Sequence, residues 1–188
     1  MGGASREELG RRYASGFAID PDAVTGYAYR GVSLGLPAWV DGLLWKTFQK
    51  SFVHDPELGL SRGWNLRLKQ TGIDGPLVAK RRRGRPWTFG HFKVGRHGGE
   101  LPGTPEGALV LDYRFGERGP LGRLIDGVVA LERDDPSRLL GRSYLAIGGR
   151  RVGTPSYFTL ARDHEVGEAV APRGAASSRK ARTSRISV

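Results

Sequence analysis

Polar side chains inside apolar runs are the first candidates for chemistry in this sequence. Asp126 shares one face of the run 123–132 with apolar side chains, because successive side chains of a strand point to opposite faces. A buried carboxylate needs a partner, and Arg142 on the next expected strand is the candidate. Asp126 is then either a general acid or base, assisted by the Tyr144 hydroxyl or by His91, or one half of an ion pair that pins two strands.

Large aromatic side chains in similar runs point to the binding of a small apolar molecule. In residues 108–115, Tyr113 shares a face with Leu109 and Leu111, so its ring is expected inside the domain. Small-molecule sites are mostly apolar cavities with a few polar groups. The candidate ligand-binding residues are Trp64, Trp87, Phe89, Tyr113, Arg142 and Tyr157.

Several other chemistries have no support in the sequence. The chain contains no cysteine, and its four histidines show neither a His-x-x-x-His nor a His-Glu-x-x-His spacing. It also lacks the G-x-x-x-x-G-K-[ST] loop and the G-x-G-x-x-G turn that cradle nucleotide phosphates. We therefore expect neither a metal site nor a cofactor.

A cluster of arginines gives an alternative function. The chain carries a formal charge of +11, and residues 80–86 read KRRRGRP. The tetrad 83–86 resembles the core of an AT-hook, in which arginines enter the minor groove of DNA, although it runs directly into an apolar strand. The candidate nucleic-acid contacts are Arg81, Arg82, Arg83 and Arg85. The alternative interpretation is a solvated surface loop, because the whole protein is rich in arginine.

The elements that must position these residues are mostly strands. Apolar and polar residues alternate from Trp64 to Gln70, which is typical of a half-buried strand, and similar runs recur between turn-forming segments. In the run 86–94 the alternation shifts phase at Gly90, which predicts a β-bulge or a barrel corner. The expected strands cover residues 27–34, 64–70, 86–94, 108–115, 123–132, 139–147 and 155–162.

One internal segment and the two ends depart from this pattern. Residues 38–49 place apolar groups at helical spacing after Pro37, which predicts one short amphipathic helix. We expect a flexible N-terminus over residues 1–13, one barrel domain over residues 14–163 and a disordered basic tail over residues 164–188.

The order of these runs carries a family resemblance. It resembles small, uncharacterised bacterial domains of the lipocalin-like or fatty-acid-binding-like class over roughly residues 27–162. The resemblance implies an antiparallel up-and-down barrel around an apolar cavity, with hydrophobic ligands in some members and cyclase or isomerase activity in others. The supporting runs are Gly31, 35–39, 45–48, 63–67, 111–113, 123–126, 140–144 and 157–160.

Together these observations predict a mainly β, lipocalin-like barrel that binds a small hydrophobic or amphipathic molecule. A cofactor-independent cyclase or isomerase that acts in the same cavity is the first alternative. Nucleic-acid binding through the AT-hook-like residues 80–86 is the second. Residues 80–86 and the C-terminal tail are also candidates for weak polyanion binding. The N-terminus shows no apolar secretion segment and no run is long enough to span a bilayer, so we expect a cytoplasmic location.

Overall fold

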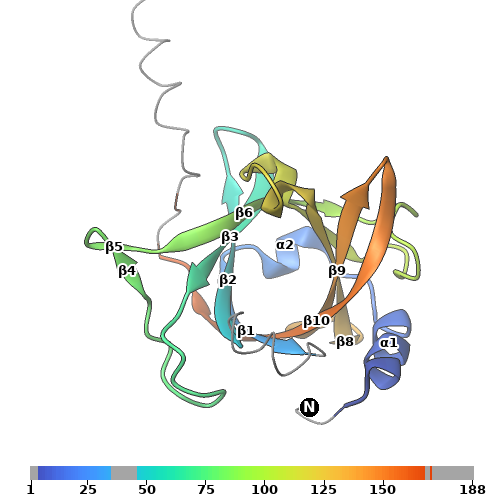
Figure 1. Cartoon of the computed structure of the whole chain (residues 1–188), viewed down its shortest axis with the longest axis horizontal. Coiled ribbons are helices and arrows are strands. Elements are labelled where there is room, and N and C mark those ends of the chain that lie inside the picture. The colour runs from blue at the N-terminus through green and yellow to red at the C-terminus, as the bar shows by residue number, and fades with distance from the viewer. Residues whose placement is uncertain (1–3, 35–45, 168–169, 171–188) are drawn as a thin grey trace, which may run out of the picture.

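Eight antiparallel strands close into a barrel (Figure 1). The computed structural model describes residues 4–34, 46–167 and 170. Around the barrel the strands follow the order β1-β10-β9-β8-β7-β6-β3-β2, so the mainly β, up-and-down fold expected from the sequence is confirmed. The strands are β1 (Tyr27–Leu34), β2 (Thr47–Asp55), β3 (Leu60–Arg67), β6 (Thr88–Arg96), β7 (Leu109–Asp112), β8 (Leu124–Glu132), β9 (Asp135–Ile147) and β10 (Arg150–Glu165).

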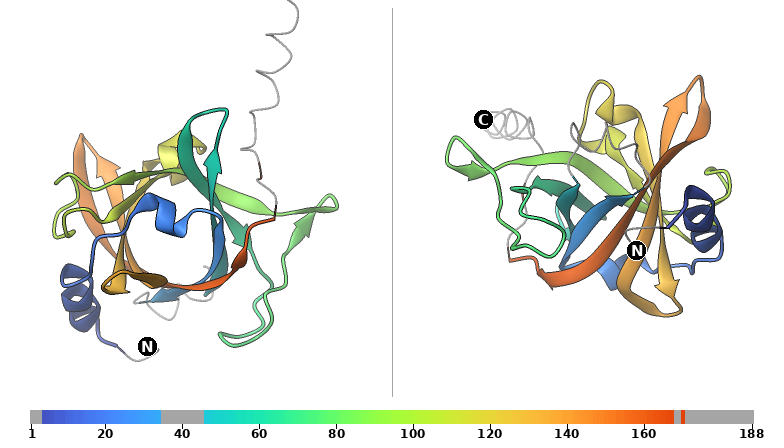
Figure 2. Two further views of the ribbon diagram at one scale, coloured as in Figure 1. Left: turned by 180° about the vertical axis from the view of Figure 1, so that it is seen from behind. Right: turned by 60° about the horizontal axis from the view of Figure 1, so that its bottom comes forward.

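Smaller elements decorate the barrel. A two-stranded ribbon extends from it between β3 and β6 (Figure 2). Its strands are β4 (Arg81–Arg82) and β5 (Arg85–Pro86), and the helices are α1 (Arg6–Ala14), α2 (Pro21–Val24), η1 (Tyr113–Phe115) and η2 (Leu121–Arg123).

The two-residue alternation predicted most of the barrel strands. The run 27–34 is β1 with the same bounds, and the other expected runs overlap β3 and β6 to β10. The expected irregularity at Gly90 is confirmed, since its φ is +55° and the register of β3 against β6 shifts beside it. The run 108–115 forms a shorter strand than expected, because the chain turns into η1 after Asp112.

Strand β2 replaces the end of the helix expected over residues 38–49. Residues 47–49 open β2, whereas residues 38–45 lie outside the described residues. From Phe48 onward the side chains of Phe48, Lys50 and Phe52 alternate with their neighbours, as in a strand. β2 pairs with β1 on one side and with β3 on the other, and this pairing overrides local helix propensity.

Helix α1 lies in the segment assigned to a flexible N-terminus, so that prediction is wrong for these residues. The Ser5 side chain caps the helix by accepting a hydrogen bond from the Glu8 backbone N–H at 3.2 Å. Leu9 and Tyr13, one turn apart, are buried against the outer wall formed by β8, β9 and β10. Two apolar residues are too few for a periodic signal, and the barrel wall supplies the remaining apolar contacts.

The last barrel strand extends into the segment assigned to the C-terminal tail. β10 ends at Glu165, and the Val166 backbone N–H donates a hydrogen bond to the Gly26 carbonyl at 2.8 Å. The barrel domain therefore continues past residue 163, while residues 171–188 lie outside the described residues.

The segment around α2 covers one end of the barrel, as the rear view in Figure 2 shows. Ile19 and Val24 of this segment belong to the same buried cluster as the rings of Tyr29, Phe52 and Phe92. The Phe52 ring packs edge to face on the other two with centroids 5.5 Å apart. This end of the interior is a filled apolar core.

Candidate functional site

Asp126 lies inside the barrel at the middle of β8, as the alternation predicted. Its side chain is 5% exposed, and two hydroxyl groups bind the carboxylate. The Tyr113 hydroxyl donates to Oδ2 at 2.7 Å, and the Ser143 hydroxyl donates to Oδ1 at 2.8 Å. Such short bonds to a charged acceptor are strong, so the carboxylate is held in one orientation.

The cation that faces Asp126 is Lys50, not Arg142 as expected. Lys50 Nζ lies 3.4 Å from Asp126 Oδ2 and donates a hydrogen bond to the Tyr113 hydroxyl at 2.6 Å. β2 and β8 stand opposite each other in the strand order, so these side chains meet only through the interior. Arg142 neighbours Ser143 on β9 and points to the outer face, where its guanidinium lies over the rings of Tyr144 and Tyr157.

Four aromatic rings surround the Lys50 ammonium group. Nζ lies 4.8 Å from the ring centroid of Phe92, 5.1 Å from Phe158, 5.2 Å from Tyr113 and 5.7 Å from Phe48. Cation–π attraction at such distances offsets part of the cost of burying the charge.

Two glycines make room for this cage. A Cβ atom on Gly31 would overlap the Phe48 ring, and one on Gly141 would overlap the Phe158 ring. These strand positions lack side chains because the rings occupy the space.

The surroundings change the proton affinities of the cluster. Burial lowers the pKa of Lys50, because desolvation disfavours the charged amine, and the Asp126 carboxylate opposes this effect. Burial raises the pKa of Tyr113 well above its ordinary value, and the neighbouring Asp126 charge adds to the increase. At neutral pH Tyr113 is therefore a hydroxyl donor, while Lys50 gives up its proton more readily than an exposed lysine.

The interior beyond this cluster is less tightly buried than the core at the α2 end. Phe48 and Leu124 stand at the starts of β2 and β8, away from α2, and both are half-buried. Phe89 is also half-buried and is the register partner of the buried Asn65. We call the set of inward-facing residues Phe48, Phe89, Leu124 and Ser143 the distal half of the barrel. These residues combine aromatic and aliphatic side chains with the hydroxyl of Ser143, which binds Asp126 of the Lys50 cluster.

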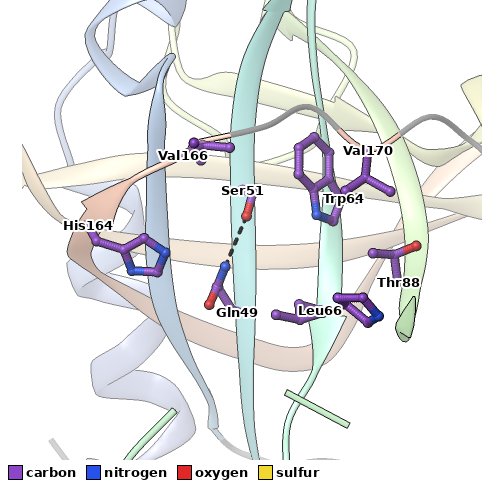
Figure 3. A pocket seen from close by; sticks show the side chains of 10 residues that line it. Gln49, Ser51, Trp64, Leu66, Thr88, His164, Val166 and Val170 are labelled. Carbon is purple, nitrogen blue, oxygen red and sulfur yellow. Dashed lines mark hydrogen bonds between the residues drawn. The ribbon is translucent and has the colours of Figure 1, made fainter. Parts of the chain in front are cut away.

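Trp64 and His91, expected in the cavity, lie outside the barrel wall. Trp64 is the register partner of Ser51 and lines a surface groove of about 190 Å³ (Figure 3). Gln49 donates a hydrogen bond to Ser51 at 3.2 Å in this groove, and Val170 covers it. The His91 ring lies 6.4 Å from the Trp64 ring, and its Nε2 lies 3.3 Å from the Thr88 hydroxyl.

Tyr144 and Tyr157 are also on the outer face. The Tyr144 hydroxyl lies 2.8 Å from the Thr104 hydroxyl, which is 3.0 Å from that of Tyr13, so these groups tie α1 and a loop to the wall. Tyr157 packs edge to face on Tyr13. The structure therefore does not bring Tyr144 or His91 to Asp126. Of the candidate ligand-binding residues, Tyr113 and Phe89 face the interior, whereas Trp64, Arg142 and Tyr157 lie on the outer face.

The basic segment forms the tip of the ribbon. Arg83 and Gly84 have positive φ angles of 53° and 76°, which turn the chain back on itself, so the tetrad is not extended. The side chains of Arg81, Arg82, Arg83 and Arg85 are exposed. Trp87 follows the ribbon, and the guanidinium groups of Arg67 and Arg82 stack on its ring at 4.4 and 5.5 Å.

Sequence reasoning missed Lys50, the residue at the centre of the site. The sequence did contain a signal for Lys50. It lies two residues from Phe48 and two from Phe52, and side chains at that spacing share one face of a strand. The helical spacing assigned to residues 38–49 ended just before it and concealed this alternation.

Within the described ranges, no group of three or more His, Cys, Asp or Glu side chains could hold a metal ion, and no helix could cross a membrane. No protein-family model matches the sequence, and no curated protein matches it significantly.

Proposed function

We propose that the protein binds a small hydrophobic or amphipathic molecule in the distal half of the barrel, with the polar end of that molecule directed at the Lys50 cluster. The observation that carries this proposal is a lysine and an aspartate buried at the centre of a mainly apolar interior. A pair of well-packed apolar residues would serve stability equally well or better, because burying two charges costs as much as their attraction returns. A ligand with a polar end could form hydrogen bonds with this pair, which would explain why the two charged residues are buried there.

The lining supports an amphipathic ligand in particular. Phe48, Phe89 and Leu124 supply apolar contact area, while Ser143 and Tyr113 supply hydroxyl groups at one end. This separation would orient a molecule with one polar end and an apolar body. It agrees with the lipocalin-like resemblance, and the lack of cysteine is in keeping with a reducing cytoplasm.

A dye titration with two matched variants tests the proposal. Nile red, an uncharged apolar dye, is expected to bind saturably and to brighten. Leu124→Trp fills the distal half and should weaken dye binding at least tenfold. Leu58→Trp makes the same exchange at a 55% exposed position and should leave binding unchanged.

A third variant separates the interior from the outer groove. Trp64→Ala removes the largest wall of that groove and should not change the affinity for the dye. Loss of binding in Trp64→Ala with full binding in Leu124→Trp would reject the interior site.

A cofactor-independent isomerase or cyclase is the second candidate function. The short bond between Tyr113 and Asp126 favours it, because a carboxylate base and a hydroxyl acid stand together beside the distal half. The probe reaction is the conversion of 3-cyclohexenone to its conjugated isomer, followed by ultraviolet absorbance. Asp126→Asn should abolish the rate. Equal rates in Asp126→Asn and the native protein would reject this candidate.

Weak polyanion binding is a separate proposal that rests on the ribbon. Four exposed arginines at its tip place positive charge away from the barrel. Binding to a DNA duplex should weaken steeply with salt, because counterions are released, and should be lost when Arg83 and Arg85 are both replaced by alanine. Retention of full affinity in that double variant would exclude the ribbon as the contact.

A further inference from the structure

Lys50 has the surroundings of a reactive amine. Among the lysines that the structure describes, it alone is buried, with 2% of its side chain exposed. A lysine amine is nucleophilic only when neutral, and a desolvated pocket is one of the ways in which proteins favour that form. The burial of Nζ supplies this desolvation, which favours the neutral amine, while Asp126 opposes it.

We propose that Lys50 forms an imine with an amphipathic aldehyde or ketone held in the distal half of the barrel. This inference rests on the proposed binding function and names its ligand class. The carbonyl group is the polar end of the ligand, and the distal half receives the apolar body.

A proton route runs from the amine to the carboxylate. Nζ lies 2.6 Å from the Tyr113 hydroxyl, and that hydroxyl lies 2.7 Å from Asp126 Oδ2. Both distances are within hydrogen-bonding range, so a proton can pass from nitrogen to carboxylate through the tyrosine. The Ser143 hydroxyl on Oδ1 holds the carboxylate in place during this transfer.

The covalent step balances without an oxidant or reductant. Ammonium Nζ first gives a proton to Asp126 through Tyr113, and its lone pair attacks the carbonyl carbon. The π electrons of the C=O bond move to oxygen, which takes a proton, while nitrogen loses one, to form a neutral carbinolamine. The proton held by Asp126 then converts the hydroxyl to water, which leaves as the nitrogen lone pair forms the C=N bond. The products are one protonated imine, one water molecule and the Asp126 carboxylate.

The aromatic cage also stabilises the product. The rings of Phe92 and Phe158 lie 4.8 and 5.1 Å from Nζ, so a cationic, protonated imine at this position keeps its cation–π contacts. Asp126 remains as its counter-charge. The buried setting limits the access of water, which would hydrolyse the imine.

Reductive trapping tests the inference on the native protein. The full chain is incubated with 4-(dimethylamino)cinnamaldehyde, whose protonated imines absorb at longer wavelength than the aldehyde, and the adduct is reduced with sodium cyanoborohydride. Peptide mapping by mass spectrometry should find one equivalent of adduct on Lys50, formed at least ten times faster than on any other lysine. Adducts confined to exposed lysines would overturn the inference, and this readout needs no variant to fold.

Variants then assign the roles. Lys50→Arg keeps the charge and should lose the red-shifted band, whereas Lys69→Arg, at an exposed position, should keep it. Tyr113→Phe keeps the ring and removes the hydroxyl, so imine formation should slow about tenfold or more. An unchanged rate in Tyr113→Phe would remove the tyrosine from the proton route and overturn that part of the inference.

Dye displacement separates this inference from the binding proposal. The aldehyde and its alcohol analogue should both displace Nile red, because both fit the distal half. Displacement by both without any adduct on Lys50 overturns the inference and leaves the binding proposal standing. Failure of the dye and of both probes to bind overturns both.

Discussion

The ion pair at the centre of the barrel gives the sharpest test of the energetics. Asp126→Asn keeps the shape of the side chain and removes its charge, so Lys50 Nζ loses the counter-charge 3.4 Å away. At an effective dielectric constant of about 20, two unit charges at that distance attract by about 5 kcal/mol.

Lys50 can escape this loss only by giving up its proton. Deprotonating a lysine of ordinary pKa near 10.4 at pH 7 costs about 4.6 kcal/mol, which is similar to the lost attraction. Asp126→Asn should therefore lower the free energy of unfolding by about 3–5 kcal/mol, as is usual when one partner of a buried pair is removed. Lys50→Met should cost a similar amount, because it leaves the carboxylate without its cation.

The double variant separates the pair from its surroundings. The double variant Lys50→Met with Asp126→Asn contains neither charge. Its decrease in the free energy of unfolding should therefore be smaller, by about 3 kcal/mol, than the sum of the decreases in the two single variants. Urea unfolding followed by tryptophan fluorescence gives these free energies by linear extrapolation.

An exposed pair supplies the matched control. Arg11 and Glu7 on α1 form an ion pair with side chains 66% and 83% exposed, and the equivalent cycle there should show a coupling below about 0.5 kcal/mol. Additive losses at Lys50 and Asp126, within about 0.5 kcal/mol, would refute the claim that their contact is electrostatically strong.

Three further predictions follow from the same structure. Burial lowers the pKa of Lys50, so between that lowered pKa and about 10.4 the folded protein binds fewer protons than the unfolded chain. In the part of this range below about pH 9.5, the free energy of unfolding should therefore rise with pH. Urea titrations at several pH values should show this rise in the native protein and not in Lys50→Met. Equal slopes would contradict the assignment. Leu9→Ala should cost about 2–4 kcal/mol in the same assay, because Leu9 is 1% exposed between α1 and the barrel, whereas Leu58→Ala should change stability by less than about 0.5 kcal/mol. Gly141→Ala should cost about 1–3 kcal/mol through overlap with the Phe158 ring, and Gly95→Ala, where no atom lies within 4 Å of the new Cβ, serves as its control; equal costs would argue against the packing account.

The elements most accurately predicted are strands that lie between turn-forming segments. β1 has the bounds of the expected run 27–34, and β8 begins one residue after the start of the run 123–132 and ends with it. β2 was not recognised, because its first residues also fit a helical spacing and only pairing with β1 and β3 makes them a strand. Helix α1 was missed for a related reason, since its two buried residues are stabilised by the barrel wall and not by each other.

The residues of the candidate site were likewise predicted only in part. Alternation correctly placed Asp126 and Tyr113 on the buried face of their strands. Alternation could not identify the partner of Asp126. Arg142, Tyr144 and Trp64 were expected in the cavity, but they lie on the outer face of the barrel wall.

By itself, then, the sequence determined which runs form most of the strands and that Asp126 lies on the apolar face of its run. Both follow from local geometry, because a strand turns every second side chain to the same face. Only the tertiary structure decided which cation meets that carboxylate. Lys50 and Asp126 are 76 residues apart and lie on opposite strands, so their contact depends on closure of the whole ring of eight strands and on its register.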